Sequence, residues 1–308
     1  MALRWQSKLI LLLVLPIAGA NLVLQAHFWM IDEPSMALWT LGISASFGLL
    51  VWRLRAGTPG AALAGICMTA SLMFSTMIFP YSPLKTALAP LVCVVLLSFI
   101  CTRIGDRFST GDRFCTGDRC STDDRFSTDD RRAERQVRVA SQVAANLGVA
   151  MLVSSPLVQN RLLSAPWFQG RFDPGLAASS LAFASMLAAL SEAAADTVSS
   201  EIGQVIGGRP RLMTTLRTVE VGTDGAVSLG GTLAGVLAAL AVSVVGSWAL
   251  GGSHKLIWIS TVAGVFGLFF DSLLGATLER RGHLNNDAVN FLSTLSAAVF
   301  AGVLVVWS

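Results

Sequence analysis

Long apolar stretches separated by short polar ones dominate this chain. A helix needs about 20 mostly apolar residues to cross the hydrocarbon core of a bilayer. Nine such windows lie near residues 9–28, 36–53, 60–80, 84–102, 139–158, 176–200, 227–249, 256–277 and 288–307. Their apolar runs are continuous rather than alternating, which favours helices over a transmembrane barrel. The pattern predicts an all-α fold, a polytopic transmembrane helical bundle with about nine spans.

Composition and the placement of charge agree with this pattern. The chain is 53% hydrophobic and 13% charged, with a mean hydropathy of +0.64, whereas soluble domains have about 25% charged residues. With a cytoplasmic N-terminus, 18 of the 22 lysines and arginines fall in cytoplasmic segments. The positive-inside rule requires such an asymmetry. We therefore expect a multi-pass protein of the cell inner membrane, embedded in the lipid bilayer, with its N-terminus and active site facing the cytoplasm.

Three regions follow from the order of these segments. Residues 1–104 form N-terminal transmembrane helices, 105–138 a low-complexity cytoplasmic linker, and 139–308 a C-terminal transmembrane catalytic bundle. The linker repeats a hexapeptide: GDRFST, GDRFCT, GDRCST, DDRFST. Its aspartates and arginines nearly cancel in charge and it has little apolar area to bury, which is typical of a flexible linker. An electrostatic surface for anionic lipid headgroups is the alternative.

Four acids interrupt the apolar segments. Glu192, Asp196 and Glu201 lie at the end of the sixth predicted span, and Asp271 lies in the eighth. A charged side chain within a membrane is costly, so such acids usually face a cavity, a metal or a substrate path. Residues four apart share a helix face, so Glu192 and Asp196 should align, whereas Glu201 points elsewhere unless the helix unwinds near Ser200. We expect Asp196, Glu201 and Asp271 to be catalytic and to bind a metal ion; interhelical hydrogen bonding is the structural alternative.

Groups suited to phosphate follow the sixth span. Arginine forks and free backbone N–H groups bind phosphate oxygens well. The segment from Gly222 to Gly225 reads first as a turn, yet it also opens the next span, where such N–H groups are available. The residues that we expect to bind nucleotide or phosphate are Ser200, Arg209, Arg211, Thr214, Thr215, Arg217, Gly222, Thr223, Asp224, Gly225, Asn286 and Asn290.

Further positions carry small or amide side chains within apolar segments. Gly231 and Gly235 form a G-x-x-x-G pattern, which most simply indicates close helix packing. At the start of the last span, Asp287 or a neighbouring asparagine is expected to cap the helix. The residues that we expect to face the organic substrate are Glu192, Asn146 and Gly275.

Several ordered motifs together resemble a known family. They are VASQVAANLG (139–148), ADTVSSEIG (195–203), RLMTT (211–215), GTDGAVSLGGTLAG (222–235), DSLLGAT (271–277) and LNNDAVN (284–290). They are similar to the polytopic family that includes the phytyl-phosphate kinase of the vitamin E pathway and transmembrane protein 19. The likeness covers roughly residues 85–307. This family often has a lysine after its S-E-I-G motif, where this chain has Gln204.

The resemblance implies phosphoryl transfer from a nucleoside triphosphate (CTP, UTP or ATP) to an isoprenoid monophosphate, giving the diphosphate. The clustered acids would hold Mg²⁺ as the cofactor. Two alternatives remain open: a transporter or flippase that uses the acids as an ion relay, and a lipid-phosphate nucleotidyltransferase. No nucleic-acid partner is expected, and the sequence leaves the oligomeric state open.

Overall fold

The structure is a computed structural model, and it describes residues 4–54, 56–111, 139–163, 176–206 and 208–307. The hexapeptide repeats from residue 112 onward therefore lie outside the described residues. The main helices are α1 (Arg4–Asp32), α2 (Pro34–Arg53), α3 (Pro59–Ser75), α4 (Leu88–Gly111), α6 (Ala140–Ser154), α8 (Leu176–Ile206), α9 (Leu229–Ala249), α10 (His254–Leu274) and α11 (Asn286–Trp307). Shorter elements are η1 (Pro83–Lys85), α7 (Pro156–Leu163), β1 (Arg211–Leu212), β2 (Ala226–Val227) and the single π turn η2 (Gly275–Glu279).

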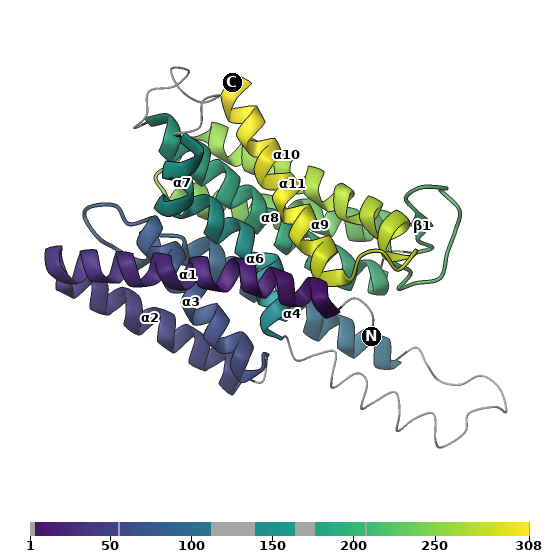
Figure 1. The fold of residues 1–308 in the computed structure, drawn as a ribbon. Helices are drawn as coiled ribbons and strands as arrows, with labels where there is room; N and C mark the ends of the chain where they lie inside the picture. Colours follow the sequence, from purple (N-terminus) through teal and green to yellow (C-terminus); the bar gives the residue numbers. More distant parts are fainter. Residues whose placement is uncertain (1–3, 55, 112–138, 164–175, 207, 308) are drawn as a thin grey trace.

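The predicted transmembrane helical bundle is confirmed. In the described ranges, seven helices are long and apolar enough to cross a membrane, judged by length and composition. Two shorter apolar helices, α3 with 17 residues and α6 with 15, occupy the third and fifth predicted windows. Their length falls short of the ~20 residues of a full span. The nine predicted windows thus correspond to nine apolar helices in the described part of the chain (Figure 1).

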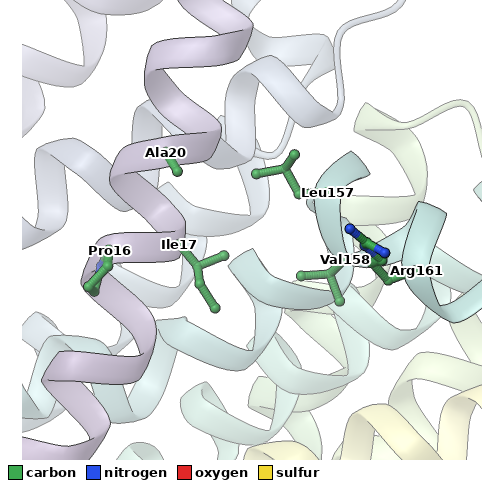
Figure 2. A pocket seen from close by; sticks show the side chains of 6 residues that line it. All are labelled: Pro16, Ile17, Ala20, Leu157, Val158 and Arg161. Carbon is green, nitrogen blue, oxygen red and sulfur yellow. The ribbon is translucent and has the colours of Figure 1, made fainter.

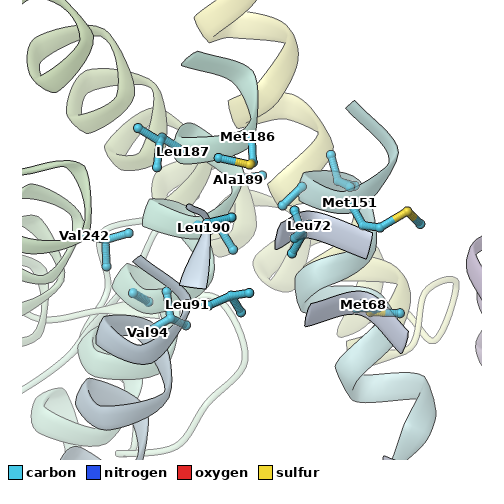
Figure 3. Packing of buried hydrophobic residues seen from close by; sticks show 14 of the residues in the cluster. Met68, Leu72, Leu91, Val94, Met151, Met186, Leu187, Ala189, Leu190 and Val242 are labelled. Atoms are coloured by element: carbon cyan, nitrogen blue, oxygen red, sulfur yellow. The ribbon is translucent and has the colours of Figure 1, made fainter. Parts of the chain in front are cut away.

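Helix α8 runs through the centre of the bundle. Of its apolar window, 78% is buried, about twice the value for any other long helix described. Met186, Leu187 and Leu190 on α8 are fully buried, and Figure 3 shows them among side chains from α3, α4, α6 and α9. Because neighbouring helices pack around α8, most of its length has no face exposed to lipid.

Glycines on α9 let it approach α8 at backbone distance. A Cβ atom added at Gly231 would lie 2.6 Å from the carbonyl oxygen of Ser199, and one at Gly235 would lie 2.9 Å from that of Ala195. Side chains larger than hydrogen would push the two helices apart. The G-x-x-x-G pattern is therefore a helix-packing motif, as predicted.

One end of the bundle gathers segments that are distant in sequence. The start of α1, the paired strands β1 and β2, and the start of α11 lie together there (Figure 1). The strands are antiparallel, with Arg211 opposite Val227 and Leu212 opposite Ala226. The two strands hold together a compact protrusion formed by residues 208–228, which we call the knob. These are the segments that the charge pattern assigns to one side of the membrane.

Substituting Gly235 tests the close contact between α8 and α9. We expect Gly235→Ala to lower the free energy of unfolding by about 1–3 kcal/mol, because its methyl group meets backbone that cannot easily move. Thermal unfolding of the detergent-solubilised protein measures this. Gly42→Ala on α2 is the matched control, since a Cβ there has no atom within 4 Å. Equal stability of the two variants would contradict the packing role.

Candidate functional site

Five acids from four segments interact electrostatically at this end of the bundle, and we call them the acidic file. Asp224 on the knob and Glu279 on η2 interact electrostatically, and Glu279 also interacts with Asp196 on α8. Asp196 in turn interacts electrostatically with Asp271 of α10 and with Glu192, which lies one turn deeper in α8. The file thus leads from the exposed knob into the interior, and its like charges must be balanced by protons or by bound cations.

The inner end of the file is enclosed by three helices. Glu192 is only 1% exposed, and its Oε1 atom has no hydrogen-bond partner; the same is true of Oδ2 of Asp271. A Cβ atom at Gly267 of α10 would lie 2.5 Å from Cγ of Glu192 and 3.0 Å from the carbonyl oxygen of Ser293 on α11. The hydroxyl of Ser293 is among the groups that act on both carboxyl groups, and it donates its own hydrogen bond to the carbonyl oxygen of Asn290 at 3.0 Å. Glycine at position 267 therefore makes the room that the Glu192 side chain occupies.

Glu201 lies apart from the acidic file. Helix α8 does not unwind near Ser200, so the five-residue offset turns Glu201 by about 140° from Asp196. Its carboxylate faces α4, where the hydroxyl of Thr102 donates a hydrogen bond to it at 3.4 Å and Gly105 packs against it. The structure thus brings Asp196 and Asp271 together, as expected, but does not bring Glu201 to them.

Sequence analysis did not identify Glu279 or Ser293. Glu279 follows Asp271 by eight residues, close to two helical turns, so the helical period alone could have placed the two acids on one face. Ser293 carries no such signal, since an isolated serine in an apolar helix usually bonds to its own backbone. Its hydroxyl does donate to the carbonyl oxygen of Asn290 at 3.0 Å, and only the packing of α11 against α8 and α10 reveals the two carboxyl groups beside it.

The knob is fastened to η2 by a contact between two glycines. Gly225 has a φ of +70°, and a Cβ atom there would overlap the backbone nitrogen of Ala276. A Cβ at Gly275 would lie 2.8 Å from the backbone nitrogen of Gly225. Gly275 is thus a docking position for the knob. This contact places Asp224 beside Glu279 and so joins the knob to the acidic file.

The segment from Gly222 to Gly225 is a turn, as first predicted, and it does not begin a helix. The backbone N–H of Thr223 donates to the carbonyl of Glu220, and that of Ala226 donates to the carbonyl of Thr223. Helix α9 starts at Leu229, four residues after Gly225, and the hydroxyl of Ser228 caps it by accepting from the N–H of Gly231 at 3.2 Å. Strand β2 separates the turn from the helix, because pairing with β1 holds residues 226 and 227 extended.

The remaining predicted phosphate-binding residues lie mostly on the surface of the knob. Exposed side chains at this end are Ser200, Arg209, Arg211, Thr214, Thr215, Arg217 and Asp224, whereas Thr223 is half-buried. Strand pairing and the hydrogen bond from the N–H of Leu212 to the carbonyl of Arg217 hold the backbone of Arg211 and Arg217. The side chains of all three arginines are exposed at this end of the bundle.

The predicted amide residues have two different environments. Asn290 donates a hydrogen bond to Asn146 of α6 at 3.0 Å, which links α11 to α6. Asn286 is exposed at the first residue of α11. Asn285 caps this helix by accepting from the N–H of Ala288 at 2.9 Å, which confirms the prediction that an asparagine or Asp287 performs this role.

Helix α1 holds the start of α11 through four hydrogen bonds. The hydroxyl of Ser7 donates to Asp287 at 2.6 Å and accepts from Asn285 at 2.9 Å. The side-chain amide of Gln6 donates to the carbonyl of His283 and accepts from the N–H of Asn285, both at 2.8 Å. The first turns of α1 therefore fix the connection between η2 and α11.

A groove of about 450 Å³ opens on a different part of the molecule, between α1 and α7 (Figure 2). Five apolar residues and one cation line it, namely Pro16, Ile17, Ala20, Leu157, Val158 and Arg161. Its lining contains no member of the acidic file.

The acids fit Mg²⁺ as a substrate-bridging ion. Within the described ranges, no three histidine, cysteine or acidic side chains are placed to hold a metal ion together. Mg²⁺ at phosphate-transfer sites is usually held by one or two carboxylates, with water and phosphate oxygens completing its octahedron. Asp196 and Asp271 are hard oxygen donors that interact electrostatically, and one oxygen of Asp271 lacks a partner. Such a pair suits an ion that arrives with a phosphate.

Fold and site together define a polytopic membrane protein with a carboxylate-lined interior at one end. More particularly, the chain belongs to the integral membrane protein family DUF92, which matches it over residues 42–298. This confirms the family resemblance that the motifs indicate. Helix α1, which fastens the start of α11, precedes the matched region.

Individual relatives match a smaller part of the chain than the family does. Over 119 residues the chain is 43% identical to an uncharacterized membrane protein of Methanocaldococcus jannaschii, covering 39% of this chain and 49% of that protein. It is 41% identical to an uncharacterized membrane protein of Synechocystis, covering 38% and 46%. It is 37% identical to Protein VTE6, chloroplastic, of Arabidopsis thaliana, covering 34% and 33%. The chain thus covers less than half of each relative. No solved structure matches it.

Alanine at Gly225 tests the docking of the knob. Gly225→Ala should detach the knob from η2, and trypsin should then cleave after Arg211 and Arg217 about tenfold faster, because overpacking costs about 1–3 kcal/mol and cleavage follows the open population. Gly222→Ala is the control, since its φ is also positive, at +87°, but no atom lies within 4 Å of a Cβ there. Equal cleavage of both variants would show that left-handed strain, rather than docking, is responsible.

Alanine at Ser7 tests the attachment of α1 to α11. Ser7→Ala leaves a buried carboxylate without one of its donors, which costs about 1–3 kcal/mol. We expect a correspondingly lower midpoint of thermal unfolding. Ser46→Ala, whose exposed hydroxyl bonds only within α2, should change stability by less than about 0.5 kcal/mol. An unchanged midpoint for Ser7→Ala would mean that α1 is held by apolar packing alone.

Proposed function

We propose that the chain is a membrane kinase that transfers a phosphoryl group from a nucleoside triphosphate to an isoprenoid monophosphate. The observation that carries the proposal is the junction of the acidic file with the arginine-bearing knob at Gly225 and Gly275. Carboxylates that hold a cation and exposed arginines that grip phosphate are the two groups that phosphoryl transfer needs side by side. The family resemblance of the motifs supports the same reaction.

The chain's own residues can be assigned parts in this reaction. Arg209, Arg211 and Arg217 bind phosphate oxygens, and their positive charge offsets the negative charge that shifts during transfer. Asp196 and Asp271 would hold Mg²⁺, which would stabilise the negative charge of the transferred group. An oxygen of the acceptor phosphate attacks the γ-phosphorus, the bond to the bridging oxygen breaks, and the nucleoside diphosphate departs.

The acceptor needs to be positioned more than deprotonated. A phosphate monoester is already ionised near neutral pH, so its oxygen can attack without a catalytic histidine. Its apolar tail would lie between helices in contact with lipid, while its phosphate reaches the knob at the membrane surface. This arrangement requires the knob to face the cytoplasm, where nucleoside triphosphates are available, in accordance with the charge pattern.

A transfer assay with product analysis tests the proposal. The purified full chain is incubated with Mg²⁺, a panel of prenyl monophosphates and each labelled triphosphate, and the products are identified by mass. We expect a prenyl diphosphate and a nucleoside diphosphate. Asp196→Asn should lower kcat at least about 100-fold, whereas Asp32→Asn, exposed at the far end of α1, should retain full activity.

Other outcomes would contradict the proposal in recognisable ways. Full activity of Asp196→Asn would remove Asp196 from the mechanism. A nucleotide-linked lipid with released pyrophosphate would identify a nucleotidyltransferase instead. Nucleotide-independent flux through liposomes that depends on Asp271, without any transfer, would identify a transporter.

A further inference from the structure

The inner end of the acidic file has polar atoms without hydrogen-bond partners, and one of its acids, Glu192, has no part in the proposed transfer reaction. Glu192 is the most deeply buried acid of the file, and Oε1 of Glu192 and Oδ2 of Asp271 both lack a hydrogen-bond partner. A buried polar atom without a partner is costly, and a buried unpaired charge costs far more. Native proteins rarely leave such atoms without a partner, and a bound ion is one way in which they are satisfied.

We propose that Glu192 and Asp271, together with the hydroxyl of Ser293, form a resident site for a divalent cation that is occupied without nucleotide. The proposal rests on the proposed function in taking Mg²⁺ as the natural ion. It extends the proposed function by assigning Glu192, the most deeply buried acid of the file, to an ion that remains in the bundle between turnovers.

The surroundings of the pair select a small, hard, doubly charged ion. The described groups that act electrostatically on Glu192 are Asp271 and Asp196, both acids. Two carboxylates and one hydroxyl offer hard oxygen ligands, and water can complete the coordination. Two negative charges are neutralised by one divalent ion. A bulky organic cation does not fit, because the backbone at Gly264 and Gly267 approaches α8 too closely.

The acidic file also supplies an entry path for the ion. Asp224 is exposed on the knob, Glu279 and Asp196 are half-buried, and Glu192 is buried. Asp196 lies one helical turn from Glu192 on the same face of α8. Successive carboxylates thus stand between the exposed knob and Glu192. In this arrangement Asp196 belongs to the path and to the nucleotide-bound ion, and Glu192 to the resident ion alone.

Cation binding without nucleotide is the direct test. The full chain in detergent is stripped of metal, and binding of Mn²⁺ is measured by electron paramagnetic resonance; thermal unfolding with and without Mg²⁺ is followed in parallel. We expect one Mn²⁺ per chain and a rise in the unfolding midpoint. Glu192→Gln should weaken binding at least about tenfold and abolish the rise. Glu220→Gln, an exposed acid on the knob, should match the wild type.

Two comparisons keep the test decisive if Glu192→Gln behaves unexpectedly. Metal-free Glu192→Gln should be at least as stable as the metal-free wild type, because the substitution removes a buried charge without changing side-chain volume. Should this variant fail to fold, Ser293→Ala removes one ligand and should weaken Mn²⁺ binding while leaving the carboxylates in place. Unaltered binding in both variants would overturn the proposal, as would a wild-type chain that binds no Mn²⁺.

The proposed function and the resident cation site can be refuted independently of each other. Asp196→Asn should lose phosphoryl transfer but keep nucleotide-free Mn²⁺ binding. Transfer that depends on Asp196, without any nucleotide-free binding, would refute the resident site alone. Binding that depends on Glu192, without transfer to any prenyl phosphate, would refute the proposed function and leave the resident site standing.

Discussion

Helix α8 carries two acids into the middle of an apolar bundle, and it can do so because glycines on its neighbours bring their backbones close. Gly231 and Gly235 on α9 lie against the backbone of α8, while Gly267 on α10 leaves the space that Glu192 fills. Without these glycines the helices would separate, and the buried carboxylate would face lipid or a void. Close backbone packing and buried charge are thus two consequences of one arrangement.

The same principle joins the surface to the interior. Gly225 and Gly275 let the knob rest on η2 at backbone distance, so exposed arginines and buried acids belong to one continuous structure. The acids of the file extend from the exposed Asp224 to the buried Glu192, and the arginines are exposed on the knob. In the membrane kinase that we propose, the acids would hold a cation and the exposed arginines would bind phosphate.

Sequence reasoning succeeded where a property depends on neighbours within one helix. The spacing of Glu192 and Asp196 places both on one face, and the structure keeps them in one file. Prediction from the sequence was less successful where the result depended on whether a helix continues or unwinds. Glu201 would join the file only if α8 unwound, and the helix instead continues to Ile206. Glu279 was overlooked, although it follows Asp271 by two turns, because it lies at the polar end of its helix among arginines.

The sequence by itself determined the class of protein, the positions of the apolar helices and the family, because hydrophobic windows and ordered motifs are local and do not depend on how the helices meet. Only the tertiary structure decided which acids share a site, since this depends on the rotation and contact of α8, α10 and α11. It alone revealed that Ser293 stands beside two carboxyl groups and that Gln6 and Ser7 of α1 fasten the start of α11. Contacts across hundreds of residues leave no local pattern in a chain.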